Sequence, residues 1–229
     1  MIVGSGLLAR AFGPAYAGRS DICVYAAGVS NSSCSDEHEF LREQRRVADA
    51  LSQNRDVEAF VYFGTCSAYD PEISGTPYVR HKLAMESMVR AHPRHLVLRL
   101  PQIAGKTPNP HTLLNFLYAR ISRSEAFNVW GRAKRNIIDA DDVVRVAQQL
   151  IANDAVRNVT VNIANPVNYS MAEIVDAMAG AVGKRAIFEV IDRGSDYSIE
   201  TGAMQPALAE SGVEFGENYL SQVLAKYYG

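Results

Sequence analysis

The fold is decided by the stretch Met1-Ile2-Val3-Gly4-Ser5-Gly6-Leu7-Leu8-Ala9. Three residues suited to a short strand lead into a glycine turn, and Leu7 to Phe12 then opens a helix. Such a turn lets the backbone approach a pyrophosphate, and the N–H groups of the helix N-terminus attract its negative charge. A tight turn from strand to helix also needs glycine without any ligand, so the motif alone is weak evidence. At the start of an α/β chain it indicates a dinucleotide-binding turn.

Apolar runs and helical patterns alternate along the chain, with short joints between them. We expect strands at 21–28, 57–63 and 94–100, helices at 36–53, 78–91 and 111–123, and a loop over 101–110. Beyond about residue 125 we expect strands at 128–130, 135–139, 159–163 and 186–190, and helices at 141–153, 171–182 and 218–228. The alternation predicts an α/β fold with a doubly wound, Rossmann-like parallel sheet.

The domain organisation follows from the same pattern, because neither a repeat nor a long linker interrupts it. We expect a single domain over 1–229. Residues 1–105 would form mainly the dinucleotide-binding core, and residues 106–229 would add core elements and a small C-terminal substrate-binding portion.

Composition excludes several classes of protein. The 229 residues carry a formal charge of −2, which argues against nucleic acid as the main partner. No apolar run is long enough to cross a membrane, and the N-terminus lacks the pattern of a signal peptide. Three cysteines without a CxxC pair, and histidines without ligand spacing, favour a reduced, cytoplasmic protein with no metal site.

The strongest chemical signal is the pair Tyr78 and Lys82, which share one helix face four residues apart. The ammonium there can lower the pKa of the phenol from its reference of about 10 toward working pH. Thr65, at the end of a preceding strand, could hydrogen-bond the same substrate oxygen. A Tyr-x-x-x-Lys pair alone is common on ordinary helices. In this chain order, together with the glycine turn, the trio predicts a proton relay beside a hydride transfer.

Other candidates leave alternatives open. Cys66 borders the predicted site, either as a reactive thiolate or, more commonly, as a small buried side chain. Arg135 suits a bidentate contact with a diphosphate, or a salt bridge to nearby aspartates. Asp21 has the spacing of a ribose-binding acid but stands at the beginning of its strand, so we interpret it as a strand-start residue.

Taken together, these segments resemble the extended short-chain dehydrogenase/reductase family, specifically its NAD-dependent epimerase/dehydratase group, which acts on nucleotide sugars. The resemblance covers most of the chain. It rests on the glycine turn, 21–30 with its paired alanines, 63–70, the Tyr78–Lys82 pair, 99–105 and 135–142.

The resemblance implies roles for individual residues. Thr65, Tyr78 and Lys82 match the catalytic set. NAD or NADP would contact Gly4, Ser5, Gly6, Leu7, Leu8, Ala26, Ala27, Gly28, Tyr78, Lys82 and Pro101. A nucleotide-sugar substrate would contact Cys66, Ser67, Asn109 and Arg135. It also implies a role in polysaccharide synthesis, and a homodimer formed through the helix of 36–53 and the helix that carries Tyr78.

Two departures from the family pattern shape the expected function. The family places two further strands between its first helix and the strand that Asp21 to Gly28 resembles, so the first half of the sheet is expected to be truncated. Arg10 is a candidate partner for a 2′-phosphate, but NAD and NADP cannot be distinguished. Sugar 4,6-dehydratases carry an Asp-Glu pair where this chain has Cys66-Ser67, so a dehydratase is not expected.

We therefore expect an NAD(P)-dependent reductase or epimerase of a nucleoside-diphosphate sugar. A binding or regulatory protein that lost turnover, and a reductase of another small carbonyl compound, remain the alternatives.

Overall fold

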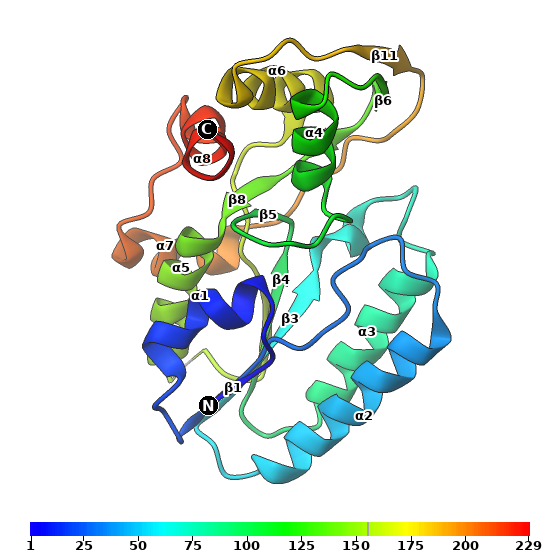
Figure 1. The fold of residues 1–229 in the computed structure, drawn as a ribbon. Coiled ribbons are helices and arrows are strands. Elements are labelled where there is room, and N and C mark those ends of the chain that lie inside the picture. The colour runs from blue at the N-terminus through cyan, green and yellow to red at the C-terminus, as the bar shows by residue number, and fades with distance from the viewer. Residues whose placement is uncertain (155) are drawn as a thin grey trace.

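A parallel sheet forms the centre of the computed structural model, which describes residues 1–154 and 156–229 (Figure 1). Its order is β1 (Ile2–Val3), β2 (Ile22–Tyr25), β3 (Ala59–Thr65), β4 (His95–Leu100) and β9 (Val159–Asn162). The strands are in register through apolar residues, so that Val24 pairs with Ile2 on one side and with Val61 on the other. The expected parallel α/β sheet is confirmed.

Helices cover both faces of this sheet. One face packs against α1 (Leu7–Tyr16), α5 (Ala140–Ala152) and α7 (Gln205–Ser211), and the other against α2 (Glu37–Gln53) and α3 (Pro77–Val89). Side chains alternate between the faces along each strand, as the period of two requires. Val24 packs toward Phe12 of α1, whereas its neighbours Cys23 and Tyr25 pack toward Val47 of α2. The doubly wound arrangement is therefore confirmed.

The sheet begins at β1, which is a two-residue edge strand, as the predicted truncation requires. Every step from β1 to β9 moves to the next strand in the same direction. A connection that moves in the same direction but passes over the other face of the sheet has the opposite hand. Because α1 and α5 lie on the opposite face from α2 and α3, the connections through α1 and α5 have the opposite hand to those through α2 and α3. Parallel crossovers are right-handed in about 98% of cases, so a sheet that holds both hands is unusual.

A second apolar cluster lies beyond the carboxyl ends of the strands, in the upper part of Figure 1. It joins α4 (Leu113–Ser122), β6 (Phe127–Trp130), α6 (Met171–Val182), β11 (Phe188–Ile191) and α8 (Tyr219–Tyr228). Two small pairings connect it to the sheet, β5 (Gln102–Ala104) with β8 (Ile137–Asp139) and β7 (Lys134–Arg135) with β10 (Tyr169–Ser170). Lys226 of α8 reaches Asp139 and Asp141 at 2.7 Å each, which fixes the last helix over the start of α5.

Local signals place the helix starts. Pro77 occupies the first turn of α3, and the hydroxyl of Thr76 accepts the N–H of Val79. Ser170 and Glu173 form a reciprocal capping box at the start of α6.

The expected loop over 101–110 is wrong in part, because it contains β5. This three-residue strand exists through its pairing with β8, a segment distant in sequence, so local pattern does not reveal it. The turns η1 (Cys66–Tyr69) and η2 (Gly202–Met204), and the short helix α7, were not predicted for a different reason: each is shorter than the window that shows helical periodicity.

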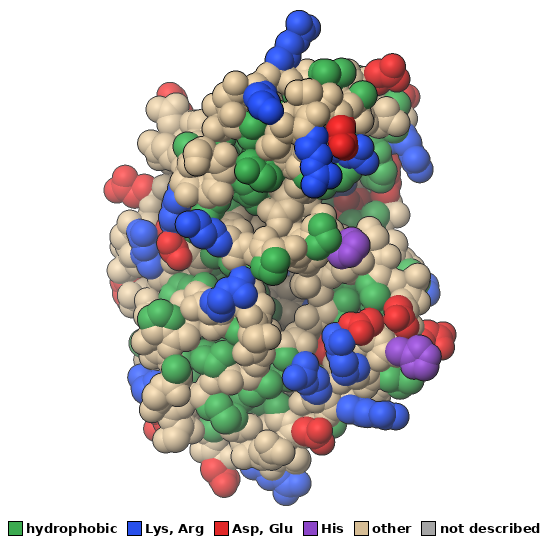
Figure 2. All heavy atoms as spheres, in the orientation of Figure 1, with side chains coloured by type: hydrophobic (Ala, Val, Ile, Leu, Met, Phe, Trp, Pro, Cys, Tyr) green, Lys and Arg blue, Asp and Glu red, His purple; other side chains and the backbone are tan. Residues whose placement is uncertain are grey.

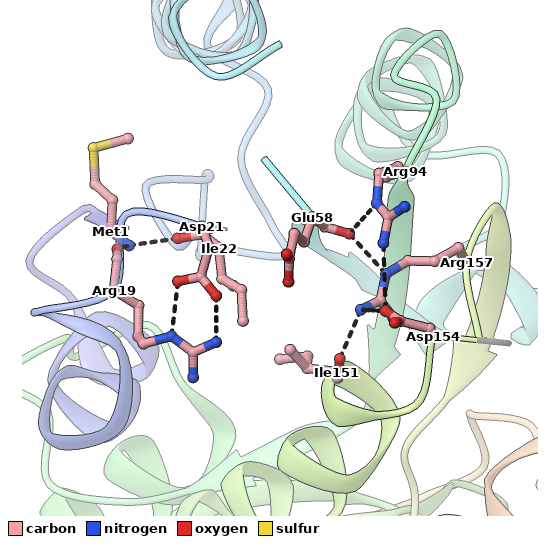
Figure 3. A network of polar contacts seen from close by, with 9 residues as sticks. All are labelled: Met1, Arg19, Asp21, Ile22, Glu58, Arg94, Ile151, Asp154 and Arg157. Carbon is pink, nitrogen blue, oxygen red and sulfur yellow. Dashed lines mark hydrogen bonds and ion pairs between the residues drawn. The ribbon is translucent and has the colours of Figure 1, made fainter. Parts of the chain in front are cut away.

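A separate polar network lies at the amino ends of the strands (Figure 3). Arg157 donates to the carbonyl of Ile151 at 2.7 Å and to that of Glu58 at 2.9 Å, while Arg94 donates to the same Glu58 carbonyl at 2.6 Å. Asp21 pairs there with Arg19, at the beginning of its strand. The interpretation of Asp21 as a strand-start residue is confirmed.

Within the described ranges, none of the helices combines the length and the apolar character that a bilayer crossing requires.

Candidate functional site

A cavity of about 1090 Å³ lies at the carboxyl ends of the strands, where the sheet meets the C-terminal part. Figure 2 shows the surface hollowed between these two parts. Most of the predicted site residues line the cavity, namely Gly4, Ser5, Gly6, Leu7, Leu8, Ala26, Ala27, Gly28, Thr65, Ser67, Tyr78, Lys82, Pro101 and Asn109. Two predicted substrate contacts, Cys66 and Arg135, are described by the structure but do not lie on the cavity wall.

The glycine turn brings backbone donors to the cavity. Gly4 adopts a φ of +130°, and a Cβ there would lie 2.4 Å from the carbonyl oxygen of Ala26. Around Gly6, by contrast, a Cβ would meet nothing within 4 Å among the described residues outside its own turn. In that part of the chain no side chain caps the start of α1, so its first N–H groups are free for an anion. The turn therefore fits a pyrophosphate.

Basic side chains surround the same part of the cavity. Arg10 donates to the carbonyls of Ser5 and Lys106 at 3.0 and 2.9 Å, and so ties the glycine turn to the loop after β5. Arg42 and Arg46 of α2 also line the cavity. These cations suit a ligand that carries phosphate.

Thr65 and Tyr78 are brought together at the cavity wall. Thr65 ends β3 and accepts the N–H of Ser67 at 3.1 Å, while Tyr78 lies in the first turn of α3. Burial raises the pKa of Tyr78 to about 12, the negative charge of Glu43 also raises it, and a hydrogen bond between the Thr65 and Tyr78 side chains opposes both. The expectation that Lys82 lowers the pKa of Tyr78 is wrong, because the Lys82 ammonium pairs with Glu43.

Lys82 binds a buried carboxylate that the sequence did not indicate. Its Nζ lies 3.2 Å from Oε1 of Glu43 on α2, and 4.4 Å from the centre of the Tyr62 ring. Glu43 is 1% exposed. Its other donors are the Tyr62 hydroxyl at 2.8 Å, the Val29 N–H at 2.7 Å and the His81 ring, whose Nε2 lies 2.9 Å away.

This cluster of polar groups decides the charge of Glu43. Burial alone would raise the pKa of the carboxyl. Lys82 and the hydrogen bonds from His81, Val29 and Tyr62 outweigh burial and lower the pKa to about 2. The Glu43 carboxyl is therefore ionised at neutral pH.

A signal for Glu43 was present in the sequence. Glu43, Val47 and Ala50 are the buried residues of α2, at the spacing of one apolar helix face. A carboxylate in such a face must find buried partners, because an unpaired buried charge is costly. The pattern could have identified Glu43 as unusual, but not its partner.

A second buried pair lies nearby, outside the cavity. Glu86 of α3 is fully buried and receives Arg99 of β4 through both Nε and Nη2, the latter at 2.7 Å. Arg99 also donates to the Tyr69 hydroxyl at 2.9 Å. This pair joins α3 to the middle of the sheet.

The remaining predicted contacts have other roles in the structure. Cys66 is buried, and burial raises the pKa of its thiol to about 12, which favours the inert alternative. Arg135 lies 3.6 Å from Asp70, whose carboxylate also accepts the Ser195 hydroxyl at 2.6 Å. This contact corresponds to the salt-bridge alternative for Arg135.

Comparison with known proteins identifies the relatives of the chain. Residues 17–164 match the model of the NAD dependent epimerase/dehydratase family. No curated protein matches the chain in sequence.

Solved structures share the fold at low sequence identity. The epimerase Mth375 from Methanothermobacter thermautotrophicus superimposes with a TM-score of 0.78 at 14% identity, over 99% of this chain and 77% of that one. UDP-glucuronic acid 4-epimerase from Bacillus cereus, in complex with UDP-glucuronic acid and NAD, gives 0.73 at 16% identity, over 91% and 74%. RMD from Pseudomonas aeruginosa, complexed with NADPH, gives 0.68 at 14% identity, over 91% and 81%. These similarities establish the architecture.

Proposed function

The chain belongs to the NAD-dependent epimerase/dehydratase family, and from that premise we propose that it interconverts an alcohol and a ketone on a nucleoside-diphosphate sugar. NAD or NADP would carry the hydride. One observation supports the proposal above the others: Thr65, Tyr78 and Lys82 line the same cavity as the glycine turn. Proton-transfer groups and a pyrophosphate cradle are thus within one ligand's reach.

In the proposed reaction Tyr78 exchanges a proton with the sugar oxygen. Its raised pKa keeps the phenol protonated at neutral pH, which suits an acid that donates to a carbonyl oxygen. Thr65, on the same cavity wall as Tyr78, would orient that oxygen. Lys82 presents a positive charge on the cavity wall and would hold the nicotinamide ribose. A bound nicotinamide ring supplies or accepts the hydride.

The chemistry is proposed to end at this interconversion. Removal of water from a sugar needs a further acid and base beside the hydroxyl residue. Here Cys66 and Ser67 follow Thr65, and Cys66 is buried away from the cavity. Ser67 and Asn109 line the cavity and are the proposed contacts of the sugar.

We also propose a homodimer through α2 and α3. Leu41 on α2 and Leu83 on α3 are 48% and 36% exposed, and these two helices lie side by side on one face of the sheet. Sedimentation of the purified protein tests this, and a monomer at all accessible concentrations would reject it.

The function is tested by binding and turnover. Titration with the oxidised and reduced forms of NAD and NADP should give saturable binding. Turnover should follow with a UDP-sugar such as UDP-glucose or UDP-glucuronic acid. Tyr78→Phe should cut turnover by about 10²–10⁴-fold while cofactor affinity and unfolding temperature stay close to wild type. An undiminished rate would remove the catalytic assignment.

A second candidate is a binding or regulatory protein without turnover. The observation that favours it is the place of β1 at the edge of the sheet, where the family pattern expects two further strands. Saturable binding of a UDP-sugar, with affinity for none of the nicotinamide nucleotides, would favour this candidate over the enzyme.

A further inference from the structure

Glu43 stands out among the charged side chains because it is buried, ionised and in contact with a proposed catalytic lysine. It comes from α2, whereas Lys82 comes from α3, so the contact crosses between two helices. We propose that Glu43 is a positioning residue that fixes the Lys82 ammonium at the cavity wall beside Gly28. This inference rests on the proposed function, and it gives a role to a residue outside the set named from the sequence.

The geometry around Gly28 supports the proposal. A Cβ on Gly28 would lie 2.8 Å from Nζ of Lys82 and 2.9 Å from Oε1 of Glu43. The ammonium and the carboxylate therefore occupy the space that a side chain would fill. Gly28 also lines the cavity, so this contact fixes the ammonium at the wall where a ligand would lie.

The remaining donors hold Glu43 itself in place. Tyr62 approaches from β3, the Val29 N–H from the turn after β2, and His81 from α3. The His81 ring stacks on Phe40 with ring centres 4.5 Å apart, so it is fixed as well. Glu43 is therefore held in place independently of Lys82, and it gives the ammonium a fixed partner.

Proton transfer through Glu43 is the competing explanation, and the charge state argues against it. A relay must take up and release protons, but lysine and histidine contacts keep this carboxyl ionised far below neutral pH. A permanently charged group acts as a counter-charge. Its effect on the reaction must therefore pass through the place and charge of Lys82.

The first test compares the cofactor affinity of four proteins. Glu43→Gln removes the charge, Glu43→Asp keeps it on a shorter side chain, and Glu86→Gln removes the neighbouring buried carboxylate, whose partner Arg99 does not line the cavity. We expect Glu43→Gln to weaken NAD(H) or NADP(H) binding about 10-fold, from loss of a charge-assisted contact. Glu43→Asp should recover part of that affinity. Glu86→Gln should bind like wild type although it unfolds at a lower temperature.

The second test measures Lys82 without any cofactor. Reductive methylation followed by peptide mass spectrometry reports how fast each lysine reacts. Lys82 should react slowly in wild type and faster in Glu43→Gln, with the exposed Lys106 as an internal reference whose rate does not change. If Glu43→Gln fails to fold, the double variant with Lys82→Met removes both charges and should restore folding, because the unpaired charge is then gone.

The outcomes separate this inference from the proposed function. Wild type that binds no nicotinamide nucleotide refutes the function, and the Lys82 labelling rates then decide whether Glu43 holds the lysine. Cofactor binding that is equal in wild type and Glu43→Gln overturns the inference while the function stands. An equal loss of affinity in Glu86→Gln also overturns it, since the effect would then come from reduced stability alone.

Discussion

Two buried ion pairs on the same face of the sheet, Glu43 with Lys82 and Glu86 with Arg99, differ in geometry and in role. Glu43 and Glu86 are 1% and 0% exposed, and each comes from a helix on the same face of the sheet. Arg99 meets Glu86 through two nitrogens, whereas Lys82 meets Glu43 through one contact at 3.2 Å. A planar guanidinium holds a carboxylate bidentately, while an ammonium is a point charge that can share its donors with a ligand.

Each carboxylate lies against a glycine, Gly64 within β3 and Gly28 in the turn after β2. A Cβ on Gly64 would lie 2.3 Å from Oε1 of Glu86, and one on Gly28 would lie 2.9 Å from Oε1 of Glu43. Both glycines line the cavity, and the difference lies in the cations: Lys82 lines the cavity, while Arg99 does not. The comparison indicates a structural clamp at Glu86, and at Glu43 a pair whose cation faces the cavity.

The largest expected effect comes from removing the arginine of the clamp. Arg99→Met leaves Glu86 fully buried with Arg90 as its remaining cation, so the free energy of unfolding should fall by about 3–5 kcal/mol. Lys82→Met should cost less, because Tyr62, His81 and the Val29 N–H still bind Glu43. Urea unfolding of both variants measures the difference, and a larger loss in Lys82→Met would contradict the comparison.

The two glycines provide a matched pair of substitutions. Gly64→Ala should lower the free energy of unfolding by about 1–3 kcal/mol, because its Cβ meets both Oε1 of Glu86 and Cγ of Arg99. Cofactor affinity should fall less than in Gly28→Ala, because Glu86 and Arg99 lie outside the cavity although Gly64 lines it. Gly28→Ala should weaken cofactor binding, because its Cβ would displace Nζ of Lys82 at the cavity wall. Equal losses of affinity in the two variants would remove the distinction between the pairs.

Acid should weaken the Glu43 pair in a defined range of pH. The pKa of this carboxyl is lowered from 4.5 to about 2 in the folded protein, so the stabilisation is complete above pH 4.5 and is lost as the pH falls toward 2. From pH 6 to pH 3 the loss from this group should be about 2 kcal/mol. The unfolding free energies of wild type and Glu43→Gln, measured across this range, should converge by that amount. Parallel curves would show that Glu43 is not ionised as described.

The smallest expected effect is that of Arg99→Lys. The charge remains but the bidentate geometry is lost, so the free energy of unfolding should fall by about 1 kcal/mol. Cofactor affinity should not change. A loss as large as that of Arg99→Met would show that the guanidinium geometry, and not its charge, holds the clamp.

Sequence reasoning succeeded where local pattern carries the information. The glycine turn and the alternation of strands and helices depend on residues within a few positions of one another. The proximity of Thr65 and Tyr78 was also predictable, because a strand end and the next helix start meet at the same sheet edge. It failed for β5, which exists through pairing with a segment distant in sequence.

The candidate site was predicted as a set of residues but not as a set of contacts. Fourteen of the sixteen residues named from the sequence line the cavity, while Cys66 and Arg135 point to other partners. The expected effect of Lys82 on Tyr78 was wrong because the i, i+4 spacing shows which helix face the two share, and not where a flexible ammonium goes. That destination depends on a carboxylate from another helix.

The sequence by itself determined the order of strands and helices, the glycine turn and the presence of Thr65, Tyr78 and Lys82, since each follows from backbone preference or spacing along the chain. Only the tertiary structure decided that Glu43, 39 residues before Lys82, becomes its partner. The physical reason is that α2 and α3 pack against the same sheet face, where a buried carboxylate must find a cation. Helix packing therefore made this pair, and no pattern within either helix specifies it.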